Sequence, residues 1–134
     1  MDIFLDRELS PRDLRALVAA IFEVSLEEIA VISCWEEMPE QESSMIIVRR
    51  APGGEFPTFI EIHPQSPGIT GEWTEQGLAR ELASRLDGRA LIYAMGRHPY
   101  EALLVTSSSY TMVELDVDEL DQHGRPKIAP RGAP

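Results

Sequence analysis

The stretch MIIVRRAPGGEFPTFIEIH, residues 45–63, carries the clearest fold signal in the chain. Residues 45–49 and 56–63 are rich in β-branched and aromatic side chains, a composition that favours two strands. The segment Ala51-Pro52-Gly53-Gly54-Glu55 between them supplies the glycines that a tight turn with positive φ requires. We therefore predict a β-hairpin over this stretch.

The second strand of this hairpin has two different faces. Phe59, Glu61 and His63 alternate with Ile60 and Ile62. Because residues i and i+2 of a strand share a face, one face is apolar and the other carries the polar groups. This alternation is typical of a sheet that is covered on one side only.

Two amphipathic helices are predicted to cover the apolar face. The first begins at Ser10-Pro11, where serine suits the N-cap and proline the first helical position. The second ends at Asp87-Gly88, a typical C-terminal signal. Apolar residues recur at helical spacing in both helices, and we expect the following to be buried: Leu14, Leu17, Val18, Ile21, Leu78, Leu82 and Leu86.

Further short apolar runs are predicted as strands, at residues 3–5, 29–35, 90–95, 102–105 and 110–117. The resulting order of strand, helix, three strands, helix and three strands predicts an α+β fold. We expect a mainly antiparallel sheet of about six or seven strands with two helices on one face. Residues 1–122 are expected to form one domain and residues 123–134 an extended or flexible tail. The face without helices would be available to a partner.

The chain is strongly acidic, with 12 basic and 23 acidic residues and a formal net charge of −11. Such a field repels phosphate backbones and anionic lipid heads, so it disfavours direct nucleic-acid binding and membrane attachment. It attracts basic protein partners instead. The sole cysteine, Cys34, cannot close an intrachain disulfide, and no signal peptide or apolar span is visible. We therefore expect a cytoplasmic protein.

Two runs of the sequence concentrate the negative charge. Between Arg15 and Arg49 there are seven glutamates and no basic residue, and a second acidic run lies between Arg97 and Arg125. Interfaces combine apolar anchors such as Trp and Met with charged rims. The partner-binding residues predicted from these two runs are Trp35, Glu36, Glu37, Met38, Glu40, Glu42, Glu114, Asp116, Asp118, Glu119 and Asp121. The alternative is a solvated surface that only aids solubility.

Patterns for catalysis and metal binding are weak. Cys34 has no identifiable base, and the neighbouring Ile32 and Trp35 indicate burial in a strand. The histidines and the single cysteine show no zinc spacing, so we expect no metal and no organic cofactor. Glu61 and His63 share a strand face, which leaves a small enzyme using His63 or Cys34 as an alternative.

Two other segments have simple structural explanations. Residues 68–71 form a glycine-containing turn before the second helix, but Glu72 and Glu75 would repel a phosphate and suit the helix start. Ser107-Ser108-Ser109 lacks the flanking glycines of a nucleophile elbow and is expected to be a turn.

The pattern as a whole resembles the small acidic immunity proteins encoded beside bacterial polymorphic toxins. The resemblance rests on the helix at residues 11–24, the turn Pro52-Gly53-Gly54, the strand at residues 57–62, the helix ending at Gly88 and the segment Val113-Glu114-Leu115-Asp116.

This resemblance implies a non-catalytic protein that binds a cognate toxin domain stoichiometrically and blocks its active site or its assembly. Nuclease toxins are often basic because they bind phosphates, so an acidic inhibitor can occupy the same surface. An adaptor or chaperone for a secreted effector, which would use the open sheet face, is the second interpretation. The oligomeric state stays open.

Overall fold

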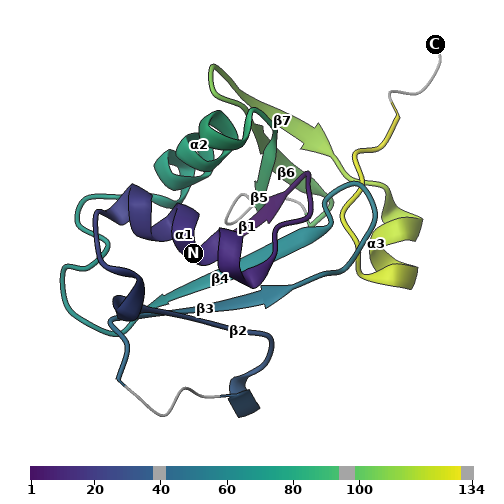
Figure 1. The fold of residues 1–134 in the computed structure, drawn as a ribbon. Helices are drawn as coiled ribbons and strands as arrows, with labels where there is room; N and C mark the ends of the chain where they lie inside the picture. The colour runs from purple at the N-terminus through teal and green to yellow at the C-terminus, as the bar shows by residue number, and fades with distance from the viewer. Residues whose placement is uncertain (38–41, 94–98, 131–134) are drawn as a thin grey trace.

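A seven-stranded sheet forms the centre of the protein, with strand order β2-β3-β4-β1-β5-β6-β7 (Figure 1). The computed structural model describes residues 1–37, 42–93 and 99–130. Every pairing between these strands is antiparallel except that of β2 with β3. The predicted α+β class and mainly antiparallel sheet are confirmed. The strands are β1 (Asp2–Leu5), β2 (Ile29–Ile32), β3 (Met45–Arg50), β4 (Thr58–Pro64), β5 (Ala90–Tyr93), β6 (Glu101–Val105) and β7 (Tyr110–Glu114).

The predicted hairpin is the pair β3 and β4. Gly53 and Gly54 at its turn have φ of 79° and 80°, a conformation that side chains with a Cβ rarely adopt. In the ladder Val48 lies opposite Glu61 and Ile46 lies opposite His63. This register places Ile60 and Ile62 in the core under the helices and turns Glu61 and His63 to the other face of the sheet.

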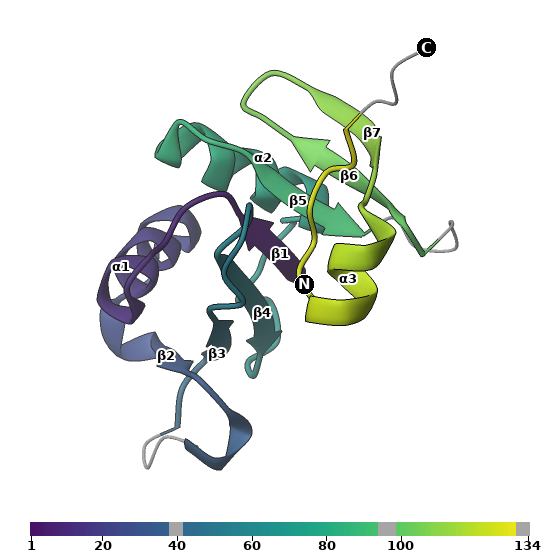
Figure 2. The ribbon, with the colours of Figure 1, turned by 90° about the vertical axis from the view of Figure 1, so that its right-hand side faces the viewer.

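Helices α1 (Pro11–Phe22) and α2 (Glu75–Leu86) both pack on one face of the sheet, as predicted (Figure 2). The N-cap side chain of Ser10 accepts a hydrogen bond from the N–H of Asp13 at 3.0 Å, and Thr74 accepts one from Gly77 at 3.0 Å. Five of the seven side chains expected to be buried are buried. Leu17 and Leu86 are half-buried at the margin of the same core.

A third helix, α3 (Val117–His123), corrects the prediction of a strand over residues 110–117. β7 ends at Glu114, and Asp116 begins the helix by accepting a hydrogen bond from the N–H of Glu119 at 2.9 Å. The sequence contains this capping signal, but it directly follows an apolar run that suits a strand. α3 lies on the side of the sheet opposite α1 and α2 (Figure 2).

The second face of the sheet, opposite α1 and α2, is therefore covered in part. Phe4, Leu91 and Ala102 on this face pack with Phe56 and Leu115, and Leu120 of α3 contacts the same cluster. After α3, the chain runs beside the end of β7: the N–H of Asp116 donates to the carbonyl of Lys127 at 2.7 Å, and the N–H of Ala129 donates to that of Glu114 at 2.8 Å. The expectation of a wholly free second face is corrected to a partly free one.

No helix in the described part of the chain is long and apolar enough to cross a membrane.

Candidate functional site

The uncovered part of the second face carries a group of polar and aromatic side chains that we call the open face. It consists of Arg50 of β3, Phe59, Glu61 and His63 of β4, Tyr93 of β5, and Trp35, which lies against His63.

Trp35 reaches the open face because the chain turns back after β2. The prediction of a strand over residues 29–35 is corrected: β2 ends at Ile32, residues 33–34 form a bend, and the 3-10 helix η2 (Trp35–Glu37) follows. The carboxylate of Glu37 holds the bend by accepting hydrogen bonds from the N–H and hydroxyl of Ser33, at 2.9 and 2.6 Å. Trp35 then makes an edge contact with the ring of His63 at 4.8 Å, while 42% of the residue remains exposed.

Glu61 links the polar side chains of the open face. Its carboxylate lies 3.2 Å from Nε2 of His63 and 3.5 Å from a guanidinium nitrogen of Arg50. The i, i+2 spacing on β4 brings Glu61 and His63 together as expected, and the hairpin register adds Arg50. The carboxylate thereby orients the histidine ring and anchors an arginine that is itself largely exposed.

Aromatic rings form the other half of the open face. Phe59 stacks on Phe4 with ring centroids 4.4 Å apart, and Tyr93 meets Phe4 edge-on at 6.0 Å. Burial of part of its ring raises the pKa of Tyr93, so its phenol stays a neutral hydroxyl at physiological pH. Because 37% of Tyr93 is exposed, an apolar ring and a hydroxyl donor are both available to a partner.

The first acidic run borders the open face at η2. Glu36 and Glu42 are exposed, whereas Glu37 is used in the bend. The pKa of Glu36 is lowered by hydrogen bonds from its own backbone and from Cys34, and that of Glu37 by hydrogen bonds from Ser33. Both carboxylates therefore keep their charge in mildly acidic solution. Met38 and Glu40, also predicted to bind a partner, lie outside the described residues.

The second acidic run surrounds α3, and several of its members have local structural roles. Asp116 caps the helix, Glu119 forms an ion pair with Arg125 at 2.9 Å, and Asp121 accepts hydrogen bonds from the hydroxyl of Tyr100 at 3.0 Å. Glu114 and Asp118 are exposed and have no ion-pair partner among residues 1–37, 42–93 and 99–130.

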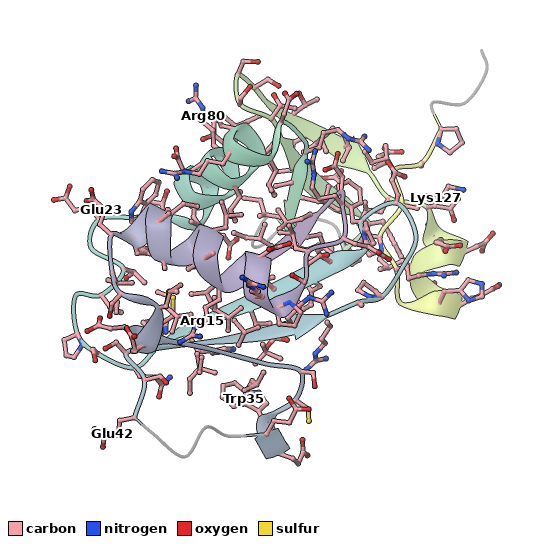
Figure 3. The ribbon with its side chains drawn as sticks, viewed as in Figure 1. Arg15, Glu23, Trp35, Glu42, Arg80 and Lys127 are labelled. Carbon is pink, nitrogen blue, oxygen red and sulfur yellow. The ribbon has the colours of Figure 1, made fainter. Side chains whose placement is uncertain are left out.

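The 3-10 helix η2 of the first acidic run and helix α3 of the second are far apart in the sequence but lie on the same side of the sheet. Glu114 instead shares the α1 and α2 face with Met112. η2 contacts the second face through Trp35 and His63, and α3 contacts it through Leu120. In Figure 3, Trp35 lies below β3, Glu42 lies farther out at the lower left, and Lys127 lies at the opposite end of the molecule beside α3. The open face therefore lies between two acidic segments.

Sequence reasoning found Trp35 and the acidic residues but missed Arg50, Phe59 and Tyr93. Phe59 alternates with Glu61 and His63, so its position on this face was readable from the strand period. Arg50 and Tyr93 join it only through the order and register of three different strands. The sequence alone contains no signal for that order.

Cys34 is not in a strand interior, which corrects the expected burial. It is half-buried in the bend before η2, and its thiol is one of the groups that lower the pKa of Glu36. Within the described ranges, no three His, Cys, Asp or Glu side chains are grouped so that they could hold a metal ion. The groups that the open face presents are the imidazole of His63, which Glu61 orients, the guanidinium of Arg50 and exposed aromatic surface.

The bend around Cys34 gives a first testable prediction. Cys34→Ser is expected to lower the free energy of unfolding by no more than about 1 kcal/mol, because the site is only half-buried and serine has nearly the same shape as cysteine. Urea unfolding followed by circular dichroism measures this. A loss well above that range would mean that the thiol has a structural role that a serine cannot supply.

Comparison of the chain with protein-family models, with curated proteins and with solved structures gives no match.

Proposed function

We propose that this protein is a non-catalytic binding protein whose open face docks onto a basic protein partner. The observation that carries the proposal is the placement of exposed Trp35, Tyr93 and Arg50 on one face, between the acidic segments at η2 and α3. Trp, Tyr and Arg are the residues most enriched among those that dominate binding energy at interfaces. A centre of aromatic and arginine side chains with a charged rim is typical of a protein-recognition surface.

The acidic border would act mainly on the rate of encounter. Exposed charges more than about 8 Å apart are largely screened at physiological salt, so each rim contact contributes little to final affinity. Their summed field still steers a basic partner toward the face that they surround. The partner is then held by the aromatic and arginine side chains at the centre.

The resemblance to acidic immunity proteins suggests the class of partner, a bacterial toxin domain neutralised by stoichiometric binding in the cytoplasm. A basic nuclease fits best, because the surface that it uses for phosphates is complementary to an acidic inhibitor. The hydrogen-bonded pair of His63 and Glu61 would serve to orient the histidine toward the partner. The same pair is the feature that favours the enzyme alternative.

The deciding experiment starts from affinity purification of the tagged protein from its native host and identification of what binds. We expect a basic protein, a one-to-one complex by calorimetry, and loss of the partner's activity in the complex. A bound partner whose activity is unaffected would favour the adaptor or chaperone alternative. Turnover of a small molecule that is lost in His63→Gln would favour an enzyme.

The acidic border gives a second testable prediction. The double variant Glu36→Lys and Glu42→Lys is expected to slow association with that partner by several-fold to about ten-fold at low salt. The matched control, Glu23→Lys with Glu72→Lys, changes the net charge equally. Both of its sites are exposed, and Glu23 lies away from Trp35 and Glu42 (Figure 3).

Surface plasmon resonance at two salt concentrations measures the effect. Raising salt should slow the wild type and narrow its difference from the double variant, whereas the control should stay close to the wild type. Equal slowing of both variants would show that only net charge matters, and the border would then have no special role.

A further inference from the structure

The two outer strands of the sheet, β2 and β7, differ in how their edges are protected. At β2, the guanidinium of Arg15 donates to the carbonyl of Ile29 at 2.9 Å, and Glu37 accepts from the N–H of Ser33 at 2.9 Å. Charged side chains thus occupy the two ends of this edge, at Ile29 and Ser33, while Ala30 and Val31 between them line a pocket beside α1. Natural sheets often guard edges in this way, because an unpaired edge is a template for another strand.

The hydrogen-bond pattern of β6 and β7 shows which groups of β7 face outward. The N–H of Thr106 donates to the carbonyl of Ser109 at 3.0 Å, and the N–H of Leu115 donates to that of Tyr100 at 2.6 Å. In an antiparallel ladder such bonded pairs alternate with unbonded ones, so Thr111 and Val113 bond to β6. The backbone groups of Tyr110, Met112 and Glu114 therefore point to the free edge.

The segment after α3 covers the C-terminal end of this edge, near Glu114. The carbonyl of Glu114 accepts from Ala129, and Leu115 and Ile128 form an isolated antiparallel bridge, so residues 127–129 cover the end of the β7 edge. Toward the N-terminal end of β7, the outward backbone N–H and C=O groups of Tyr110 and Met112 have no partner among the described residues. The side chains of both are also 41% exposed. A short stretch of β7 is thus left ready for strand addition.

The charges beside this stretch indicate what would bind there. Glu101 and Glu114 lie directly opposite each other on β6 and β7, on the same face as Met112, and neither has an ion-pair partner within residues 1–37, 42–93 and 99–130. Like charges in directly opposed positions are unfavourable. A lysine or arginine opposite Met112 on an added strand would lie diagonal to Glu114, with its aliphatic stem on Met112.

We propose that the free edge of β7 binds an extended segment of the basic partner, which adds to the sheet through the N–H and C=O of Tyr110 and Met112. The segment carries a lysine or arginine that lies diagonal to Glu114 and offsets part of the repulsion between Glu114 and Glu101. This inference rests on the proposed function only in that the segment belongs to the basic partner. Arg80, whose guanidinium donates to the carbonyl of Ser107 at 2.9 Å and lies 5.9 Å from the ring of Tyr110, marks the other end of the site.

The test uses random twelve-residue peptides displayed on phage, selected on the immobilised full chain. Selected peptides are expected to share an alternating pattern with one lysine or arginine. Bound peptide should slow amide hydrogen exchange of Tyr110 and Met112 at least ten-fold. Exchange of Thr111 and Val113, already bonded to β6, should change little.

Variants at one position separate the backbone contribution from that of the side chain. Met112→Pro removes the outward N–H while the bonds to β6 stay, a position where proline is tolerated, and should weaken peptide binding at least ten-fold. Met112→Leu keeps the N–H and an apolar side chain and should bind within two-fold of wild type. If the proline variant does not fold, Glu101→Gln with Glu114→Gln tests the charge instead and should weaken binding at least three-fold.

Several results would overturn the inference. They are the absence of enriched peptides, equal binding by Met112→Pro and Met112→Leu, and exchange changes without the alternating pattern. Faster exchange of Tyr110 and Met112 in a chain ending at Pro130 would identify residues 131–134 as the occupant. A dimer that Met112→Pro dissociates would identify a second copy. The peptide test needs no natural partner, so its failure leaves the open-face proposal standing.

Discussion

Replacing Thr58 with valine is expected to lower the free energy of unfolding by about 2–4 kcal/mol, although valine has nearly the same shape. Thr58 is fully buried, and its hydroxyl accepts a hydrogen bond from the N–H of Leu9 at 3.1 Å while it donates to the carbonyl of Arg7 at 2.7 Å. Valine leaves both backbone groups without a partner. Each unsatisfied buried group costs about 1–3 kcal/mol.

Thr58→Ser is the matched control, because it keeps the hydroxyl and removes one methyl group. We expect a loss of about 1 kcal/mol for serine. Urea unfolding of the three proteins, followed by circular dichroism, measures both effects. Valine and serine variants of equal stability would show that the hydroxyl has no net effect on folding.

The position of Thr58 explains why this side chain has such a large expected effect. It ties the connection between β1 and α1 to β4, and Arg49 adds a second tie by donating from Nε to the carbonyl of Leu9 at 2.6 Å. These contacts fix where α1 begins and so how it lies on the sheet. On the face of β4 that packs against the helices, Ile60 and Ile62 contribute to the core and Thr58 holds the connection before α1. The opposite face of β4 carries the polar side chains of the open face.

The parts of the fold that were predicted from sequence have strong local signals. The hairpin has two glycines at its turn, and α1 and α2 have caps and apolar stripes of the right period. α3 was missed because a helix of seven residues offers no stripe, and its cap at Asp116 follows a run that suits a strand. The residue types of Cys34 and Trp35 favour a strand, but the hydrogen bonds from Ser33 to the carboxylate of Glu37 bend the chain there.

The sequence predicts only those parts of the candidate site that follow from a run of charged residues or from the two-residue period of a strand. Runs of glutamate and aspartate are visible in any sequence, and the i, i+2 spacing of Glu61 and His63 is enough to pair them. Whether Trp35 lies in the core or on the surface depends on a bend held by one carboxylate. The meeting of Arg50, Phe59 and Tyr93 depends on strand order, which is a long-range property.

Replacing Trp35 with alanine is expected to weaken binding of the natural partner by about 30-fold or more, which corresponds to a loss of at least about 2 kcal/mol. Trp35 is the largest exposed ring beside the open face, with 42% of its surface exposed in the free protein. Covering that surface removes a large apolar area from water, and tryptophan is the residue most often found to dominate interfaces. The change should appear mainly as faster dissociation, because short-range contacts act after encounter.

Leu26→Ala is the matched control, since Leu26 is 47% exposed in the 3-10 helix before β2 and does not belong to the open face. It should bind within two-fold of wild type. Trp35→Phe keeps a ring against His63 and should lose less than alanine does. Surface plasmon resonance with the identified partner gives the rates, and circular dichroism confirms that each variant is folded. If Trp35→Ala dissociates no faster than Leu26→Ala, the open face is not the centre of the interface, and the free edge of β7 becomes the surface to test next.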